Sequence, residues 1–520
     1  MPQRRPPGEL LALAVLAVTL LLPIWWGAEG QFAWDNSIAP SEVLRAMARR
    51  FAPDFFFTYG PVPYYLFAGA YVLVLVPLKL TGELGQPSTQ YPWGFDHPEL
   101  SMAALVVAAH LVTFALAMTL AVLAARRERD QGYSWLAPIA LLGSPVFAFY
   151  ARTSNVDLHY LFWGWLAVHL AETGRSLARL CWAVVAAVVA ICTKEQVAPI
   201  AITVIVFALA RAWRLPGREE GGLRAVGALL LAAAATYVAV WRLPYALESW
   251  LIHHAFILGP ARYARDFPAT FAGMAALYGR SLQMLPSVLG FPILAGVALA
   301  LLLRVSWAGL GLRTCACFAY AIGFLATIGY VYERFLLPFL LLAVPLAVRG
   351  YRAAFEAWAQ HPLRVRALGA AAVALALAGG PLLSWVMLND PRYEMERWIR
   401  AHLTADAVVE IGGNPHYQAR VPRRLKVVRV DADSLRDRPR GPVGDLVLTS
   451  SIDRYAFERE PEAQRRWLAV LEDRSAAGAY SRIVFPRGIG ARLFPALEIP
   501  DIVAYVRRGG SKMRGRPPGS

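Results

Sequence analysis

An aspartate shortly after the first hydrophobic segment is the position in this chain best placed for acid–base chemistry. Asp35 lies in the run Trp34-Asp35-Asn36-Ser37, which follows the apolar residues 9–27. Charges are costly near a lipid bilayer, so a carboxylate kept at a membrane edge is by default a functional candidate. The alternative is that Asp35 caps a helix that begins near Ser37. We interpret Asp35 as a general base that works on a lipid-borne substrate.

Further charged residues lie at the ends of later apolar segments. The candidates are Asp157, the neighbours Lys194 and Glu195, and the neighbours Glu333 and Arg334. We expect Lys194 and Arg334 to bind an anionic group, Arg with two parallel hydrogen bonds, and Asp157 to be catalytic. Glu195 and Glu333 are possible substrate contacts. The alternatives are a helix cap at Asp157 and local ion pairs within Lys194-Glu195 and Glu333-Arg334.

Aromatic and histidine residues near the same loops are candidate substrate contacts. Tyr59 and Tyr64 border the prolines at 61 and 63, and an aromatic ring there can stack on a sugar or serve in an interfacial belt. His97 follows Asp96, and two adjacent histidines lie at His253-His254. We interpret Asp96-His97 and His253-His254 mainly as solvated or interfacial, and contact with substrate or a metal is the alternative.

The composition is that of an integral membrane protein. The chain has 520 residues, of which 57% are hydrophobic. A net charge of +16 could indicate nucleic acid in a soluble protein, but here most arginines fall in short loops between apolar runs and the sequence has no nucleic-acid-binding signature. The four cysteines lie in or beside apolar segments and match neither a disulfide framework nor zinc spacing.

Apolar runs of spanning length recur along the first three quarters of the chain. We expect eleven transmembrane helices, near 9–27, 100–125, 135–150, 156–172, 178–192, 197–211, 224–242, 281–304, 313–331, 335–349 and 366–388.

A further apolar segment, 61–80, is ambiguous. If it lies on the membrane surface, seventeen arginines fall on the cytoplasmic side, whereas the short outer loops hold only Arg152, Lys194 and Arg334. If it spans, this bias reverses. We therefore expect 61–80 to be interfacial, the N-terminus to be cytoplasmic and the candidate residues to share the outer face.

The chain divides into three parts. Residues 1–388 form a transmembrane catalytic domain with an outer loop, 28–98, that carries surface helices. Residues 389–508 form a small extracytoplasmic α/β domain, with a helix at 391–403 and strands at 408–411, 426–430, 445–448, 482–485 and 502–506. Residues 509–520 form a disordered tail rich in Gly, Pro and Arg.

The motifs together resemble the polytopic glycosyltransferases of the GT-C type. The nearest family, glycosyltransferase family 39-like, includes protein O-mannosyltransferases and lipid A aminoarabinose transferases. The resembling pieces are Asp35, Tyr59-Gly60-Pro61-Val62-Pro63-Tyr64-Tyr65, Ser154-Asn155-Val156-Asp157, Thr193-Lys194-Glu195 and Tyr332-Glu333-Arg334. The resemblance implies a mainly α, GT-C-like fold and a sugar donor linked to polyprenyl phosphate. Family members often have a second acid where this chain has Asn36, so a divalent cation held by an acidic pair is left open and no metal ligand is assigned.

Elementary chemistry agrees with that resemblance. Phosphate leaves with the electrons of the broken bond and needs cations more than a proton, which suits Lys194 and Arg334. The acceptor hydroxyl needs a base, which Asp35 can be. We expect an inverting sugar transfer at the outer face of a bacterial inner membrane, to a lipid, glycan or protein acceptor. The alternatives are a lipid or glycan transporter or flippase, against which stands the lack of an internal repeat, and a non-catalytic envelope assembly protein.

Overall fold

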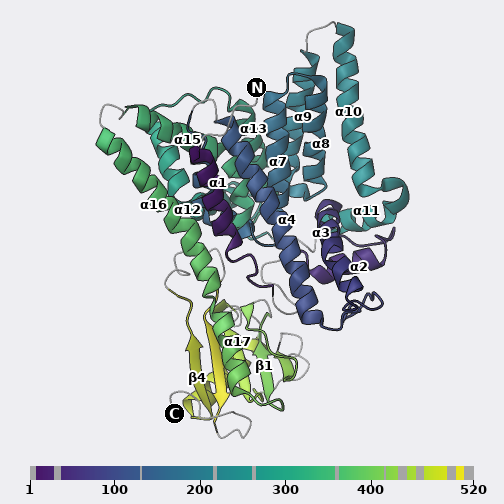
Figure 1. Cartoon of the computed structure of the whole chain (residues 1–520), viewed down its shortest axis with the longest axis vertical. Coiled ribbons are helices and arrows are strands. Elements are labelled where there is room, and N and C mark those ends of the chain that lie inside the picture. Colours follow the sequence, from purple (N-terminus) through teal and green to yellow (C-terminus); the bar gives the residue numbers. More distant parts are fainter. Residues whose placement is uncertain are drawn as a thin grey trace. The chain divides into compact units, whose positions relative to one another are not determined.

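The chain folds into two compact units, Met1–Pro381 (unit 1) and Leu382–Ser520 (unit 2) (Figure 1). The computed structural model describes residues 7–28, 37–128, 132–214, 219–259, 265–357, 362–414, 417–430, 442–452, 462–488 and 499–508. Asp35, Asn36 and the tail 509–520 lie outside the described residues. Helix α16 crosses the division between the units.

Unit 1 is helical, and every apolar segment expected to span contains helix, although α1 ends at Leu21 rather than near residue 27. The elements are α1 (Pro7–Leu21), α2 (Pro40–Ala48), α3 (Pro61–Leu80), α4 (Pro98–Arg127), α5 (Leu136–Leu142), α6 (Pro145–Tyr150), α7 (Val156–Thr173), α8 (Leu177–Ile191), η2 (Glu195–Val197), α9 (Ala198–Trp213), α10 (Glu219–Trp241), α11 (Leu243–Leu258), α12 (Phe271–Leu302), α13 (Gly311–Tyr320), η4 (Ala321–Leu325), α14 (Ala326–Ile328), η5 (Glu333–Phe339), α15 (Leu340–Ala357) and α16 (Pro362–Leu388).

Two expected segments differ from the observed helices. The stretch 135–150 is split into α5 and α6, because Ser144 is extended and its side chain accepts a hydrogen bond from the backbone N–H of Phe147 at 3.2 Å, which starts a new helix before Pro145. The stretch 281–304 belongs to α12, which begins at Phe271 and is interrupted at Gly290, where φ is +73°.

The chain is a polytopic helical membrane protein. Among the described residues, seven helical stretches are long and apolar enough to cross a membrane by length and composition: Pro61–Leu80, Pro98–Arg127, Glu195–Trp213, Gly222–Trp241, Phe271–Leu302, Gly311–Ile328 and Glu333–Ala357. Helices α1 and α8 are apolar but shorter. The number of eleven crossings stays a prediction.

Helix α3, which we expected on the membrane surface, packs along the first half of α4 (Figure 1). Its first turn meets the end of α8, where the N–H of Val62 donates to the carbonyl of Cys192 at 3.4 Å. Beyond its last turn, Glu83 accepts a hydrogen bond from Ser101 in the first turn of α4 at 3.2 Å. Helix α3 therefore starts where α8 ends and leads away from α7, α8 and α9. The surface position of α3 stays a prediction, and α3 is long and apolar enough to span.

Unit 2 is a small α/β fold. Strands β1 (Val408–Gly412), β2 (Lys426–Val430), β3 (Leu446–Ser450), β4 (Tyr480–Phe485) and β5 (Ile502–Arg507) form one sheet in the order β2-β1-β3-β5-β4. The first three are parallel, and β5 is antiparallel to β3 and β4. Helices α17 (Pro391–His402) and α20 (Glu462–Ala476) accompany the sheet. The expected α/β character is confirmed, and α20 is an addition to it.

Candidate active site

A cavity of about 1000 Å³ lies in unit 1 and is lined at one side by residues of η2 and η5 and by Lys194, which precedes η2. Its polar lining includes Lys194, Glu195 and Arg334, three of the residues expected at the site. Its apolar lining comes from α9, α11, α13, η4 and α14 and consists mainly of Ala198, Pro199, Ile202, Ile257, Leu258, Ile322, Phe324 and Ile328. The cavity therefore combines a cationic region with long apolar walls, as an amphipathic anion requires.

Asp157 joins the two expected cations. Its Oδ1 lies 2.5 Å from Lys194 Nζ and its Oδ2 lies 3.4 Å from Arg334 Nε. The Asp157 side chain is fully buried and does not line the cavity, whereas both cations do. Asp157 thus contacts Lys194 and Arg334 on the side that faces away from the cavity. The ion pairs of Lys194 and Arg334 are formed with this distant residue and not with the neighbours Glu195 and Glu333, which were the alternatives.

The position of Asp157 follows from how α7 begins. The side chain of Asn155, not that of Asp157, caps this helix, because its Oδ1 accepts a hydrogen bond from the N–H of Asp157 at 2.8 Å. The alternative role of Asp157 as the cap is therefore wrong. The carboxylate is free to point across to the turn between α8 and η2.

A close backbone contact brings Tyr59 to the same turn. A Cβ on Gly60 would lie 2.0 Å from the carbonyl oxygen of Cys192, so only glycine fits there. Tyr59 lines the cavity, and its ring centroid is 5.3 Å from Lys194 Nζ. The rings of Phe335 and Tyr160 lie 5.6 and 5.8 Å from the same ammonium. Burial lowers the pKa of Lys194, and the negative charge of Asp157 opposes this shift.

Glu195 pairs with a histidine that we expected to be solvated. His253 is buried, its Nε2 lies 2.7 Å from Glu195 Oε1, and its Nδ1 lies 2.8 Å from the carbonyl oxygen of Phe57. A carbonyl can only accept, so Nδ1 carries a proton. The contact between Nε2 and Oε1 then needs one further proton, which the two residues share. Since Glu195 lines the cavity, this pair presents an oriented proton-bearing group to it.

Arg265 is a cavity residue that sequence reasoning missed. Arg265 lines the cavity, and its guanidinium donates to the carbonyl of Ala326, the first residue of α14, at 3.0 Å. The signal in the sequence was an arginine shortly after the apolar segment of α11, but its position depends on the contact of its side chain with Gly329.

Three expected substrate contacts lie elsewhere. Tyr64 is buried and its hydroxyl donates to Glu42 at 2.9 Å. His97 is exposed and its Nδ1 lies 2.7 Å from Glu83. Glu333 is half-buried in the first turn of η5. None of the three lines the cavity.

The expected base and a metal site remain open. Asp35 lies outside the described residues, so its role stays a prediction. Within the described ranges, no group of three or more His, Cys, Asp or Glu side chains could hold a metal ion.

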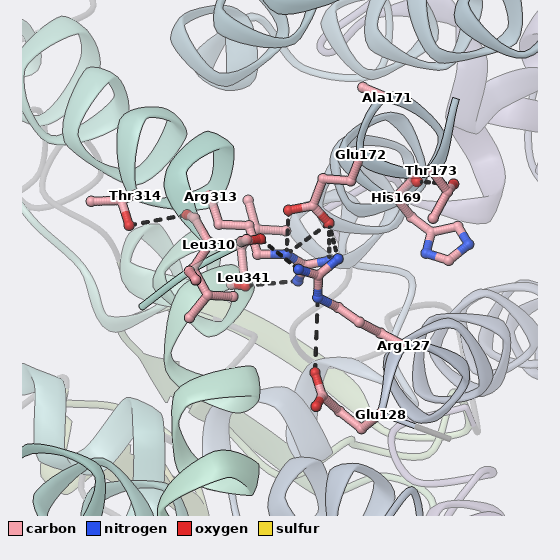
Figure 2. A network of polar contacts seen from close by, with 12 residues as sticks. Arg127, Glu128, His169, Ala171, Glu172, Thr173, Leu310, Arg313, Thr314 and Leu341 are labelled. Atoms are coloured by element: carbon pink, nitrogen blue, oxygen red, sulfur yellow. Dashed lines mark hydrogen bonds and ion pairs between the residues drawn. The ribbon is translucent and has the colours of Figure 1, made fainter. Parts of the chain in front are cut away.

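A second set of charged residues lies at the other end of α7 (Figure 2). Glu172 Oε2 is 2.6 Å from Arg127 Nη1 and 3.0 Å from Arg313 Nη2, and Arg313 also donates to the carbonyl of Leu341 at 2.9 Å. Arg127 lies 3.8 Å from Glu128. These contacts link the ends of α4, α7 and α13 to α15, and we did not expect them because Glu172 is a lone acid in its segment.

Comparison with known proteins gives structural likenesses only. No family model and no curated protein sequence matches the chain. Among solved structures, ArnT from Cupriavidus metallidurans, a lipid A aminoarabinose transferase, is similar in the apo state with 14% identity and a TM-score of 0.47, over 94% of this chain and 97% of that chain. The form of ArnT bound to undecaprenyl phosphate has 14% identity and a TM-score of 0.49, over 95% and 97%.

The S. cerevisiae protein O-mannosyltransferase Pmt1-Pmt2 complex bound to the sugar donor is similar with 16% identity and a TM-score of 0.31, over 47% of this chain and 35% of that chain. Both kinds of enzyme named from the sequence motifs are thus among the structures to which the chain is similar. Because the identities and TM-scores are low, the function has to rest on the chain's own residues.

Proposed function

We propose that the chain is a membrane glycosyltransferase that moves a sugar from a polyprenyl-phosphate-linked donor to an acceptor hydroxyl. The observation that carries the proposal is the pairing of Lys194 and Arg334 with the buried Asp157 at the wall of an otherwise largely apolar cavity. Two cations share one carboxylate, so the group keeps a net positive charge next to the cavity. A phosphate joined to a long apolar tail matches both parts of this lining.

On this proposal, Lys194 and Arg334 stabilise the leaving group, which is the lipid phosphate. When the bond between the sugar C1 and the phosphate oxygen breaks, negative charge develops on that oxygen. Lys194 and Arg334 neutralise this charge, and their arrangement is fixed beforehand by Asp157. Asp157 is on this proposal a positioning residue, because it is fully buried and does not line the cavity.

The remaining chemistry needs a base and contacts to the sugar. We assign the base to Asp35, which accepts the proton of the acceptor hydroxyl while its oxygen attacks the sugar C1 in a single, inverting displacement. Glu195 and Tyr59, which line the cavity, are assigned to the sugar hydroxyls and the sugar ring. The acceptor is a lipid, glycan or protein.

The distribution of buried charges favours an enzyme over a transporter. Within the described part of unit 1, the buried ion pairs lie near the two ends of α7, at Asp157 and at Glu172. These residues are about 22 Å apart at 1.5 Å per helical residue. A transport path needs ionisable groups near the bilayer midplane, at the alternating-access site.

The sidedness of the site is part of the proposal. We assign Asp157, Lys194 and Arg334 to the outer face of a bacterial inner membrane, and unit 2 to the same side. A reporter fused after Arg127 is expected to signal cytoplasm, and one fused after Asp390 the outside. An outward signal at Arg127 would mean that α3 spans and would reverse the assignment.

The direct test is lipid binding followed by transfer. The purified protein in detergent is offered a polyprenyl phosphate or the polyprenol of the same length, and native mass spectrometry counts the bound lipid. We expect the phosphate form to bind at least tenfold more tightly, since two charge-assisted contacts depend on it. Equal binding of both lipids would overturn the donor assignment.

Transfer is tested in cells. Mass spectrometry of surface glycans and lipids from a deletion strain is expected to show the loss of one sugar modification, which the wild-type gene restores and an Arg334→Ala gene does not. An unchanged set of surface sugars would contradict the proposed activity. This experiment also identifies the sugar and the acceptor.

A further inference from the structure

A second cavity, of about 500 Å³, lies at the end of α7 opposite to Asp157. This is the size of a small-molecule site. Its lining is polar and comes from the turn between α7 and α8 and from the last turns of α9: Glu172, Thr173, Arg175, Ser176, Arg179 and Arg211. Three guanidinium groups and two hydroxyls thus surround one space.

Arg211 is held in place at the wall of this cavity. Its Nη1 donates to the carbonyl oxygens of Ala171 and Glu172, both at 2.8 Å, at the C-terminal end of α7. A guanidinium has five N–H groups, and these two bonds use only those of Nη1. The other nitrogens of Arg211 are left for a ligand.

Arg175 and Arg179 bring two further charges to the cavity. Both are exposed, and within the described part of the chain no hydrogen bond or ion pair engages either side chain. They lie before and within the first turn of α8, which Ser176 caps by accepting from the N–H of Arg179 at 3.4 Å.

The acid in the lining does not neutralise these arginines. The carboxylate of Glu172 points to Arg127 and Arg313, on the side of α4 and α13 (Figure 2). It accepts from Arg313 Nε at 3.1 Å and from Arg127 Nη1 at 2.6 Å, so two cations already share its single charge. The cavity therefore keeps the full positive charge of its three arginines.

From the length and composition of the helix that carries Arg211, we infer that the cavity lies at the depth of the membrane interface. Arg211 is in the last turn of the apolar stretch Glu195–Trp213, which is long enough to cross a membrane. Trp213, at its end, has 55% of its surface exposed, as is typical of a tryptophan that anchors a helix at the lipid headgroups. A lipid phosphate would stand at the same level.

We propose that this second cavity binds a phosphate oxyanion, that of an anionic phospholipid headgroup, between Arg175, Arg179 and Arg211. The positive-inside rule explains why arginines gather on one side of the membrane. It does not explain why three of them surround one polar cavity together with Thr173 and Ser176. The inference does not depend on the proposed transferase activity, because the two cavities lie at opposite ends of α7.

The test compares variants in lipid nanodiscs. The full-length protein is reconstituted in phosphatidylcholine with a minor fraction of phosphatidylglycerol, and native mass spectrometry counts the phosphatidylglycerol that stays bound after transfer to detergent. Arg175→Gln and Arg179→Gln are each expected to weaken its retention about fivefold, and the double variant about twentyfold or more. Arg126→Gln is the matched control. Arg126 is exposed in the last turn of α4 and does not line the cavity, and this substitution removes one positive charge, as Arg175→Gln and Arg179→Gln each do.

A second arm separates the two sources of phosphate. Protein in pure phosphatidylcholine is titrated with inorganic phosphate while its thermal unfolding is followed. Stabilisation by inorganic phosphate that is lost in the double variant, without retention of phosphatidylglycerol, would assign the same site to a soluble phosphate. If the double variant matches wild type and Arg126→Gln in both arms, the site does not exist.

Discussion

Lys194 Nζ and Asp157 Oδ1 lie 2.5 Å apart, although 37 positions separate the two residues in the chain. The contact ties the first turn of α7 to the turn between α8 and η2 and places the ammonium at the wall of the larger cavity. Both side chains are nearly or fully buried, with exposures of 11% and 0%. A buried pair of this kind is strongly destabilised when one partner is removed, because the other charge is then left unpaired.

The first prediction is a thermodynamic coupling between these two residues. Lys194→Met alone is expected to destabilise the protein by about 3 kcal/mol, since Asp157 then keeps only the longer contact with Arg334. Asp157→Asn combined with Lys194→Met is expected to cost less than the sum of the two single changes. Thermal unfolding in detergent measures all four proteins. Simple additivity would contradict the pairing.

The second prediction concerns Arg334. Arg334→Ala is expected to raise the KM for the lipid donor roughly tenfold or more, because a charge-assisted contact to phosphate is lost. Arg334→Lys should recover only part of the loss, since a single ammonium cannot form the two parallel hydrogen bonds of a guanidinium. The matched control is Arg280→Ala, which removes an exposed arginine of α12. A normal KM in Arg334→Ala would leave Arg334 as a structural partner of Asp157.

The helices and strands could be predicted from the sequence where a single local pattern of residue types determines the element. The strand Lys426–Val430 is observed with the expected bounds, because three of its five residues are β-branched valines. The grouping of Lys194 with Arg334 also follows from the sequence, since both lie at ends of apolar segments on the same expected side. The outward placement itself stays a prediction.

The pairings within the site could not be read from the sequence. Lys194 is adjacent to Glu195, yet it pairs with Asp157, while Glu195 pairs with His253. Which acid pairs with which base depends on the packing of α7, α8 and α11, and this packing cannot be predicted from a local motif. Arg265 was missed for the same reason, because its place depends on the contact of its side chain with Gly329.

The third prediction tests whether Glu195 and His253 act as a unit. Glu195→Gln keeps the size of the side chain but removes the charge, and it is expected to lower kcat/KM roughly tenfold because charge-assisted hydrogen bonds are about twice as strong as neutral ones. His253→Gln should have a smaller effect in the same direction. The double variant should be no worse than Glu195→Gln, since both changes break one contact. Multiplied effects would show that the two residues act separately.

The fourth prediction concerns the pH dependence of the loop before α4. The hydrogen bond with Glu83 raises the pKa of His97, and the hydrogen bond with His97 lowers the pKa of Glu83. The raised His97 pKa means that the contact is present at lower pH and is lost as pH rises through it. The lowered Glu83 pKa means that the contact is also lost as pH falls through it. The pair is therefore intact between these two pKa values.

Hydrogen exchange gives the measurement for this loop. The N–H of His97, which donates to Glu83 at 2.5 Å, should be most protected within that window, after correction for the intrinsic dependence of exchange on pH. The loop around Arg49 and Asp54, whose ion pair at 2.7 Å contains no histidine, is the internal control at the alkaline side. Equal loss of protection in both loops as pH rises would contradict the assignment to His97.

The last prediction is about Asp35, the expected base. Asp35→Asn keeps the shape of the side chain and any capping role but removes the proton acceptor. If Asp35 activates the acceptor hydroxyl, transfer should fall by about 10²-fold or more, with little change in donor binding. If Asp35 only caps the helix that follows it, the variant should work almost normally, because Asn caps about as well as Asp. Transfer and lipid binding are measured on the same purified protein, so one substitution separates a base from a cap, and full transfer by Asp35→Asn would show that the base lies elsewhere.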